Sequence, residues 1–281
     1  MGFELIDGMS FAGGMVWNSG EAPPPPSGGN LVMTFNTALA NTNPGNVYLP
    51  LGGYGGTVNA TINWGDGNTA EPANGANVYS HTYATANTYT VTVTGTVTGY
   101  GQTFSSGENE PLVSVDSWDN DLGLTDLFAA FYYATNLNEV PNTLPANVQF
   151  LNSAFSGANI FNQDLNGWNT SNVSGWDQVF QSASAFNGNI SNWTTTSGAM
   201  TSMFAGASSF NQNISGWNTS GIQYMDNMFQ NAASFNQNLS SWITGLTTQP
   251  TNFSTDANAI FANNASNLKP YLSGGTVRIN N

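Results

Sequence analysis

Charged side chains are scarce in this chain, at 6% of 281 residues, whereas about a quarter of an ordinary soluble domain is charged. Only two cations, Lys269 and Arg278, oppose 16 carboxylates, so the formal net charge is −14. A nucleic-acid backbone needs several lysine or arginine contacts, and a phosphate-binding loop needs a lysine after its glycines. We therefore expect no binding of nucleic acid.

Cysteine is absent, and His81 is the single histidine. These counts exclude disulfides, thiol nucleophiles, cysteine-based metal centres and sites with several histidine ligands. We therefore expect a protein that is not an enzyme and needs no cofactor. No apolar run approaches the roughly 18–20 residues of a membrane helix, so no membrane span is expected.

Apolar residues are nevertheless plentiful, at 40% of the chain, and aromatic residues make up 12%. The remainder is mostly asparagine, threonine, serine, glutamine and glycine, which favour turns and strands over long surface helices. The composition therefore predicts a mainly β protein with a substantial core.

Residues 1–22 place bulky apolar side chains between glycines, and residues 23–30 form a linker with four consecutive prolines. Such prolines favour a stiff polyproline II spacer. An apolar peptide at residues 1–22, followed by a stiff spacer at residues 23–30, predicts a segment that anchors the chain to a partner. The alternative is a disordered tail. The start lacks the basic and apolar regions of a secretory signal peptide. The anchor side chains that we expect to contact the partner are Phe3, Leu5, Ile6, Phe11 and Trp17.

Residues 31–112 alternate apolar and polar side chains and carry turn residues every 8–12 positions, which predicts an antiparallel β-sandwich. A W-G-D-G turn at 64–67, an H-T-Y segment at 81–83 and a strand Y-T-V-T-V at 89–93 follow in order. Together they resemble the PKD domain, an immunoglobulin-like module. We expect Asp66 to cap the turn and His81 to be structural.

Residues 113–249 contain a repeat of 24–25 residues, F-x-x-A-x-x-F-N-Q/G-x-I/L-x-x-W. A unit this short must stack on its neighbours to bury a core. We expect one short helix or 3₁₀ turn and one short strand in each coil, with residues 250–281 as a cap. We expect the aromatic columns to be core, although an exposed ligand-binding stripe is an alternative. The recurring positions are Phe155, Phe180, Phe204 and Phe229; Phe161, Phe186, Phe210 and Phe235; Trp168, Trp193, Trp217 and Trp242; and an asparagine ladder at Asn162, Asn187, Asn211 and Asn236.

These repeats resemble the BspA-like family of surface proteins, including the leading M-F at 203–204 and 228–229. The resemblance implies a leucine-rich-repeat-like solenoid and a role in adhesion, with a host-surface glycan or protein as ligand. It supplies no catalytic residues.

Six carboxylates fall within residues 108–126, and Asp119 and Asp121 are candidate calcium ligands among them. A solvated junction between two modules is the alternative. The acids of the repeats, Asp164, Asp177 and Asp226, are not expected to recur in register, which argues against a repeated active groove.

These observations predict an immunoglobulin-like β-sandwich followed by a short leucine-rich-repeat-like solenoid. The function that they favour is non-enzymatic display on a virion, as a phage-type decoration or fibre protein. Residues 1–22 would bind a capsid, tail or filament protein, and release by lysis would explain the absence of a signal peptide. The alternative is a bacterial cell-surface adhesin. The expected location is the virion surface or the extracellular space, and whether the chain forms a homo-oligomer stays open.

Overall fold

The computed structural model describes residues 28–39, 45–53, 55–68, 71–75, 77–101, 108–257, 270 and 279. The predicted anchor, with Phe3, Leu5, Ile6, Phe11 and Trp17, lies outside these residues, as does most of the linker. The described part is mainly β and contains no α-helix. Among its elements, none is a helix long and apolar enough to cross a membrane.

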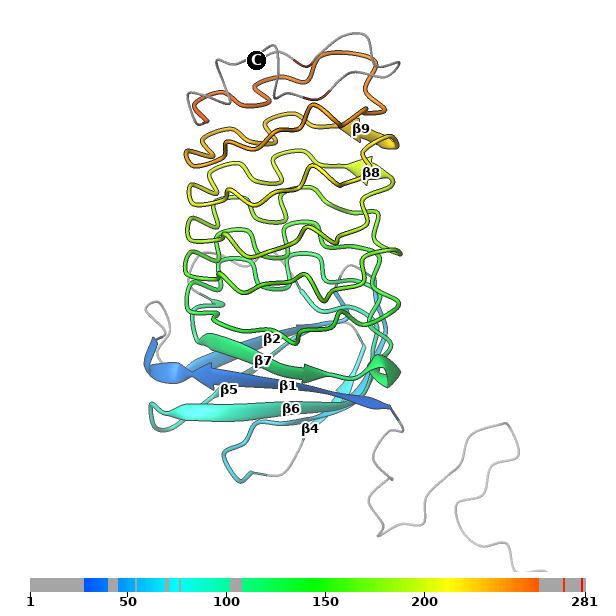
Figure 1. Cartoon of the computed structure of the whole chain (residues 1–281). Helices are drawn as coiled ribbons and strands as arrows, with labels where there is room; N and C mark the ends of the chain where they lie inside the picture. Colours follow the sequence, from blue (N-terminus) through cyan, green and yellow to red (C-terminus); the bar gives the residue numbers. More distant parts are fainter. Residues whose placement is uncertain are drawn as a thin grey trace, which may run out of the picture.

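Two antiparallel sheets, whose strands lie within residues 29–118, form the body nearest the N-terminus (Figure 1). We call this body the sandwich. The second sheet pairs β2 with β5, and one core cluster includes buried residues of both sheets, such as Met33, Leu49 and Val93. The alternating burial of β1 and β6 follows the period of two seen in the sequence. The five-stranded sheet has the order β4 (Glu71–Asn74), β3 (Val58–Asn63), β6 (Thr88–Val97), β1 (Gly29–Asn36) and β7 (Leu112–Trp118), and the second contains β2 (Asn46–Leu51) and β5 (Asn77–Thr82).

The W-G-D-G turn has the structure that its residues predict. Gly65 has a φ of +77°, and a Cβ there would lie 2.2 Å from the carbonyl oxygen of Thr90. Asp66 caps the turn by accepting a 3.1 Å hydrogen bond from the backbone N–H of Asn68. Burial opposes its charge, but hydrogen bonds from Asn68 and His81 outweigh this effect and hold the pKa of Asp66 below its usual value.

His81 has structural contacts on several sides. Its Nε2 lies 2.8 Å from the Asp66 carboxylate, and its ring stacks on Trp64 with centroids 5.0 Å apart. Tyr83 packs edge-on against the imidazole at 4.6 Å and donates its hydroxyl to the Trp64 carbonyl at 2.6 Å. The geometry agrees with the structural role expected for His81.

Strand β7 belongs to the five-stranded sheet and also begins the repeat stack. It pairs antiparallel with β1, while Ser114 forms a parallel bridge with Glu139 of the first coil. The Trp118 indole donates to the Thr143 carbonyl at 2.6 Å and lies 5.8 Å from the ring of Trp168. The predicted boundary between residues 112 and 113 therefore falls inside β7, at its first residue. A 3₁₀ helix, η2 (Asn120–Leu122), follows the strand, and another, η1 (Thr37–Leu39), follows β1.

Beyond β7 the chain winds in coils that stack as layers from the sandwich toward the C-terminus (Figure 1). Parallel bridges join Asp126 to Phe150, Phe150 to Gly175 and Gly175 to Ala199, at intervals of one coil. The short strands β8 (Gly198–Ala199) and β9 (Ile222–Tyr224) extend this column. We call the series Asp126, Phe150, Gly175, Ala199 and Tyr224 the bridge column.

The expectation of a short helix or 3₁₀ turn in each coil is wrong. The F-x-x-A segments are successive turns, in which Ala158 N–H donates to the Phe155 carbonyl at 3.1 Å. Phe155 N–H instead donates to Val179 of the next coil at 2.9 Å. A helix is prevented because two residues per coil have positive φ. One lies two positions before the phenylalanine, as at Ser153 (57°), and the other two positions after it, as at Gly157 (74°).

Three aromatic columns fill the centre of the stack, and all their members are buried. In the first column, consecutive rings from Phe155 to Phe180, Phe204 and Phe229 lie 5.4, 5.8 and 5.6 Å apart. These distances are typical of stacked aromatic pairs. The prediction that the columns are core is confirmed, and the alternative of an exposed aromatic stripe is wrong.

The asparagine ladder is confirmed. The side-chain oxygens of the first three asparagines each accept a hydrogen bond from the backbone N–H of the next asparagine. Asn187 N–H donates to Asn162 at 2.6 Å, and Asn211 N–H donates to Asn187 at 2.9 Å. Asn211 accepts the same bond from Asn236 at 2.9 Å. The side-chain amides thus satisfy backbone groups that the turns leave free.

A second ladder was not anticipated from the sequence. Each repeat tryptophan donates its indole N–H to a carbonyl of the preceding coil, which belongs to Pro141 for Trp168 and to the I/L position for the other three. Trp193 donates to Leu165 at 2.9 Å, and Trp217 donates to Ile190 at 3.1 Å. The tryptophans therefore fill the core and also fix the register between coils.

The hydrogen-bond pattern of the coils continues beyond residue 249, where the sequence analysis places a cap. Phe229 N–H donates to Phe253 at 2.8 Å, and Asn231 N–H donates to Thr255 at 2.9 Å. Buried Ser254 takes the position that phenylalanine holds in earlier coils.

We expect Trp217→Phe to reduce the free energy of unfolding by about 1–3 kcal/mol, because it leaves the buried Ile190 carbonyl without its donor. Chemical denaturation measures this change. The control is Ile243→Ala, whose side chain is 51% exposed, and it should alter stability by less than about 0.5 kcal/mol. Equal losses in the two variants would contradict a special role for the indole ladder.

Candidate functional site

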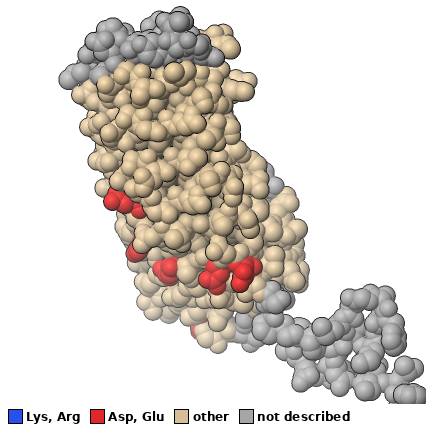
Figure 2. All heavy atoms as spheres, turned by 45° about the vertical axis from the view of Figure 1, so that its right-hand side comes forward, with Lys and Arg blue, Asp and Glu red and all other residues tan. Residues whose placement is uncertain are grey.

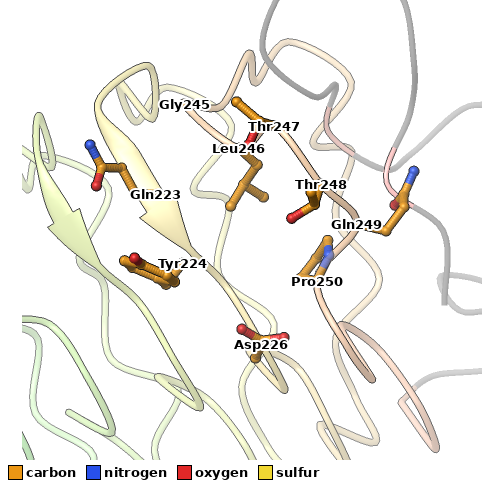
Figure 3. A pocket seen from close by; sticks show the side chains of 9 residues that line it. All are labelled: Gln223, Tyr224, Asp226, Gly245, Leu246, Thr247, Thr248, Gln249 and Pro250. Atoms are coloured by element: carbon orange, nitrogen blue, oxygen red, sulfur yellow. The ribbon is translucent and has the colours of Figure 1, made fainter.

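A groove of about 470 Å³ lies between β9 and residues 245–250, which belong to the next coil. Figure 3 shows Tyr224 and Asp226 on one side, Thr248 and Pro250 on the other, and Leu246 between them. The volume is within the range of small-molecule sites, about 300–1,000 Å³. The groove is lined by Gln223, Tyr224, Asp226, Gly245, Leu246, Thr247, Thr248, Gln249 and Pro250.

The groove forms because the bridge column ends at Tyr224. Among the described residues, no bridge joins β9 to the segment 247–250. Two sets of hydrogen bonds hold the walls together at the ends of the groove. Gly245 N–H donates to the Ile222 carbonyl at 2.9 Å, and Thr251 N–H donates to Asp226 Oδ1 at 2.6 Å.

A proline stands at the end of the wall formed by residues 245–250. Pro250 is buried and occupies the position that Met200 and Met225 hold in the preceding coils. It has no N–H to donate, and it restricts the preceding residue to extended backbone.

Tyr224 supplies an exposed aromatic surface on the wall formed by β9. Its side chain is 58% exposed, whereas the two preceding members of the bridge column are Gly175 and Ala199. Phe150, also in this column, is 43% exposed, but its ring lies against the next coil, 3.0 Å from the place of a Cβ on Gly175. Tyr224 is thus the more exposed of the two aromatic residues in the bridge column, and it lies where the groove opens.

Among the described residues that line the groove, Asp226 is the one acidic residue, and none is a lysine or arginine. Its Oδ1 accepts hydrogen bonds from the Thr251 hydroxyl at 2.5 Å and the Thr251 N–H at 2.6 Å. These bonds hold the pKa of Asp226 below its usual value. The carboxylate is therefore ionised at neutral pH and accepts hydrogen bonds without supplying a proton.

Asp177 and Asp226 occupy the same position two coils apart, with Thr201 between them, so the expectation that these acids do not share a register is wrong. Thr201 N–H donates to Asp177 Oδ1 at 2.8 Å, just as Thr251 N–H donates to Asp226. Asp164 has a different place in its coil and accepts from Asn189 N–H at 2.7 Å. In all three cases the carboxylate satisfies a backbone donor of the next coil.

The calcium candidates lie at the junction between sandwich and coils. Asp119 Oδ2 accepts hydrogen bonds from the N–H and Nδ2 of Asn30, at 2.8 and 3.2 Å, which links the start of β1 to η2. Asp121 lies within η2. The described part of the chain contains no group of three or more histidines, aspartates or glutamates arranged for a metal ion. Figure 2 shows, on one face, that most acidic side chains lie toward the sandwich end.

A family described as "Mycoplasma protein of unknown function, DUF285" matches residues 100–199 and 151–268, which together cover more than half of the chain. The chain belongs to this family. The match supports the resemblance of the repeats to BspA-like proteins. The DUF285 ranges include β9 and residues 245–250, so the groove lies within the family region. They begin after the residues that resemble a PKD domain, and that resemblance stays a prediction.

No curated protein and no solved structure matches the chain.

The groove was not among the features predicted from the sequence. One signal was present, because tyrosine at 224 replaces the glycine and alanine found at the corresponding positions of the two preceding repeats. The opening itself depends on where residues 247–250 run, and the periodicity carries no information on that path.

The low pKa of Asp226 predicts a pH dependence that Asp226→Asn should remove. Because the pKa is lower in the folded chain, the carboxylate contributes stability above its unfolded value of about 3.9, and the contribution is lost as pH falls through the folded value. We expect the native chain to melt above the variant at pH 7, with a difference that shrinks below about pH 4. Asp121→Asn is an exposed control, and a difference that persists unchanged at pH 3 would contradict this assignment.

For the junction, we expect the melting temperature to be the same in calcium and in a chelator, because Asp119 already accepts two hydrogen bonds from Asn30. Differential scanning calorimetry on the full chain tests this. A rise in calcium that Asp121→Asn abolishes would instead identify a cation site.

Proposed function

We propose that this chain is a non-enzymatic surface protein of the BspA-like type, in which a leucine-rich-repeat-like solenoid presents a binding groove. An immunoglobulin-like, PKD-type sandwich would support the solenoid at its N-terminal end. The observation that carries the proposal is the continuous buried core, which runs from the sandwich through the coils and holds the groove on fixed backbone. Sites built on such rigid elements keep their geometry without a ligand.

The family match is the reason to place this protein on a cell surface. The DUF285 match supports the bacterial surface adhesin of the sequence analysis, and it gives no support to display on a virion. An anchoring role for residues 1–22 is compatible with either setting and remains a prediction about residues outside those that the structure describes.

Binding without catalysis is supported by the state of Asp226. Acid-catalysed hydrolysis of a glycoside needs a carboxyl group whose pKa is raised, so that it carries a proton at neutral pH. Hydrogen bonds from Thr251 lower the pKa of Asp226 instead. The groove is therefore suited to hold a ligand and leave it unchanged.

Saturable binding of the labelled full chain to a panel of animal and bacterial cells, measured by flow cytometry, tests the proposal. We expect saturation on at least one cell type and loss of binding in Phe204→Ala, which should destabilise the core by about 3–5 kcal/mol. Binding that is unsaturable, or that is equal for the native and the heat-unfolded chain, would refute a specific adhesive function.

A further inference from the structure

We propose that the groove between β9 and residues 245–250 binds a neutral oligosaccharide, with Tyr224 as the platform for a sugar ring. This inference rests on the proposed binding function and names the ligand class. The charge, the hydrogen-bonding groups and the shape of the groove all favour this ligand class.

The charge of the groove excludes several ligand classes. Anionic ligands such as phosphates or acidic sugars need cationic partners, and among the described residues the lining contains the Asp226 carboxylate and no lysine or arginine. A metal cation needs several oxygen ligands, and Asp226 Oδ1 already accepts two bonds from Thr251. A neutral ligand is compatible with this lining.

The groove combines many polar groups with one flat apolar surface. Gln223, Thr247, Thr248 and Gln249 bring amide and hydroxyl groups, which both donate and accept hydrogen bonds, and Asp226 accepts only. Tyr224 adds an aromatic ring to the lining, and the residue is 58% exposed. A sugar presents hydroxyl groups around its edge and C–H groups on its face, so its chemistry matches both features.

The shape favours a sugar over an extended peptide. A peptide would bind by pairing with the edge of β9, but this strand has three residues, and strand addition gains affinity from longer runs of backbone pairing. Specificity for a peptide also needs apolar pockets for alternate side chains, whereas Leu246 is buried between the walls. A volume of about 470 Å³ fits a short oligosaccharide that lies along the groove.

The test is binding of the full chain to an array of neutral and acidic oligosaccharides, followed by calorimetric titration of the best neutral ligand. We expect Tyr224→Ala to weaken binding by about tenfold, because the ring supplies the stacking surface. Tyr224→Phe keeps the ring and should retain most of the affinity, and Gln223→Ala should weaken binding several-fold. Phe150→Ala, which removes an exposed aromatic of the same bridge column outside the groove, is the matched control and should bind as the native chain does.

Each other result has a distinct meaning. Tyr224 and Gln223 are exposed, so the melting temperatures of their variants should be unchanged, and this separates lost binding from lost folding. Saturable cell binding without any oligosaccharide binding overturns this inference and leaves the proposed function intact, whereas absence of both overturns the two together. Preference for acidic oligosaccharides, equal losses in Tyr224→Ala and Phe150→Ala, or binding of an extended peptide alone would each overturn the assignment.

Discussion

Alternate backbone N–H groups of each coil donate to carbonyls of the next coil, and this alternation requires positive φ at fixed places in every repeat. Ser153, Gln178, Ser202 and Asn227 all have φ between 55° and 60°, at intervals of 24 or 25 residues. Such backbone is unfavourable for residues other than glycine, so the contacts between coils must stabilise it. The aromatic columns and the asparagine and tryptophan ladders depend on this register, because each joins a residue to its counterpart one coil away. The scarcity of charge follows as well, since amides and hydroxyls satisfy the turns without introducing repulsion between stacked copies.

The sandwich closes one end of the stack. A stack of coils has two open ends, each of which exposes backbone groups and a layer of aromatic side chains. Strand β7 covers the first coil, and Trp118 fills the place of the tryptophan that this coil lacks, donating to Thr143. A second contact joins the two bodies at Tyr100. Its backbone N–H donates to the backbone carbonyl of Asp126 at 2.9 Å, and its buried ring lies 6.3 Å from the ring of Phe131. The two bodies therefore share one core, and the stability of the coils depends on the folded sandwich.

Periodicity in the sequence predicted the features that repeat, because a buried column needs the same residue type in every unit. Phe180, Trp193 and Asn187 could be placed in the core or the ladder from spacing alone. The sign of φ at Ser153 or Gln178 could not, since neither residue type favours positive φ, and the F-x-x-A spacing suits a short helix as well as successive turns. The path of residues 247–250 and the exposure of Tyr224 depend on where the repeat pattern changes. A feature found in one coil only has no periodic signal, and it requires coordinates to be seen.

The groove lies near the end of the stack away from the sandwich, and its walls belong to two successive coils. An insertion or deletion of one 24–25-residue unit between β7 and β9 would preserve the contacts within the remaining coils, since each coil bonds only to its neighbours. Such a change would move Tyr224 along the stack by about 5 Å, the spacing of paired strands, while its lining stayed the same. The number of repeats therefore sets the distance between the groove and the sandwich. Chains that differ in the copy number of one unit would carry the same groove at different distances from the sandwich.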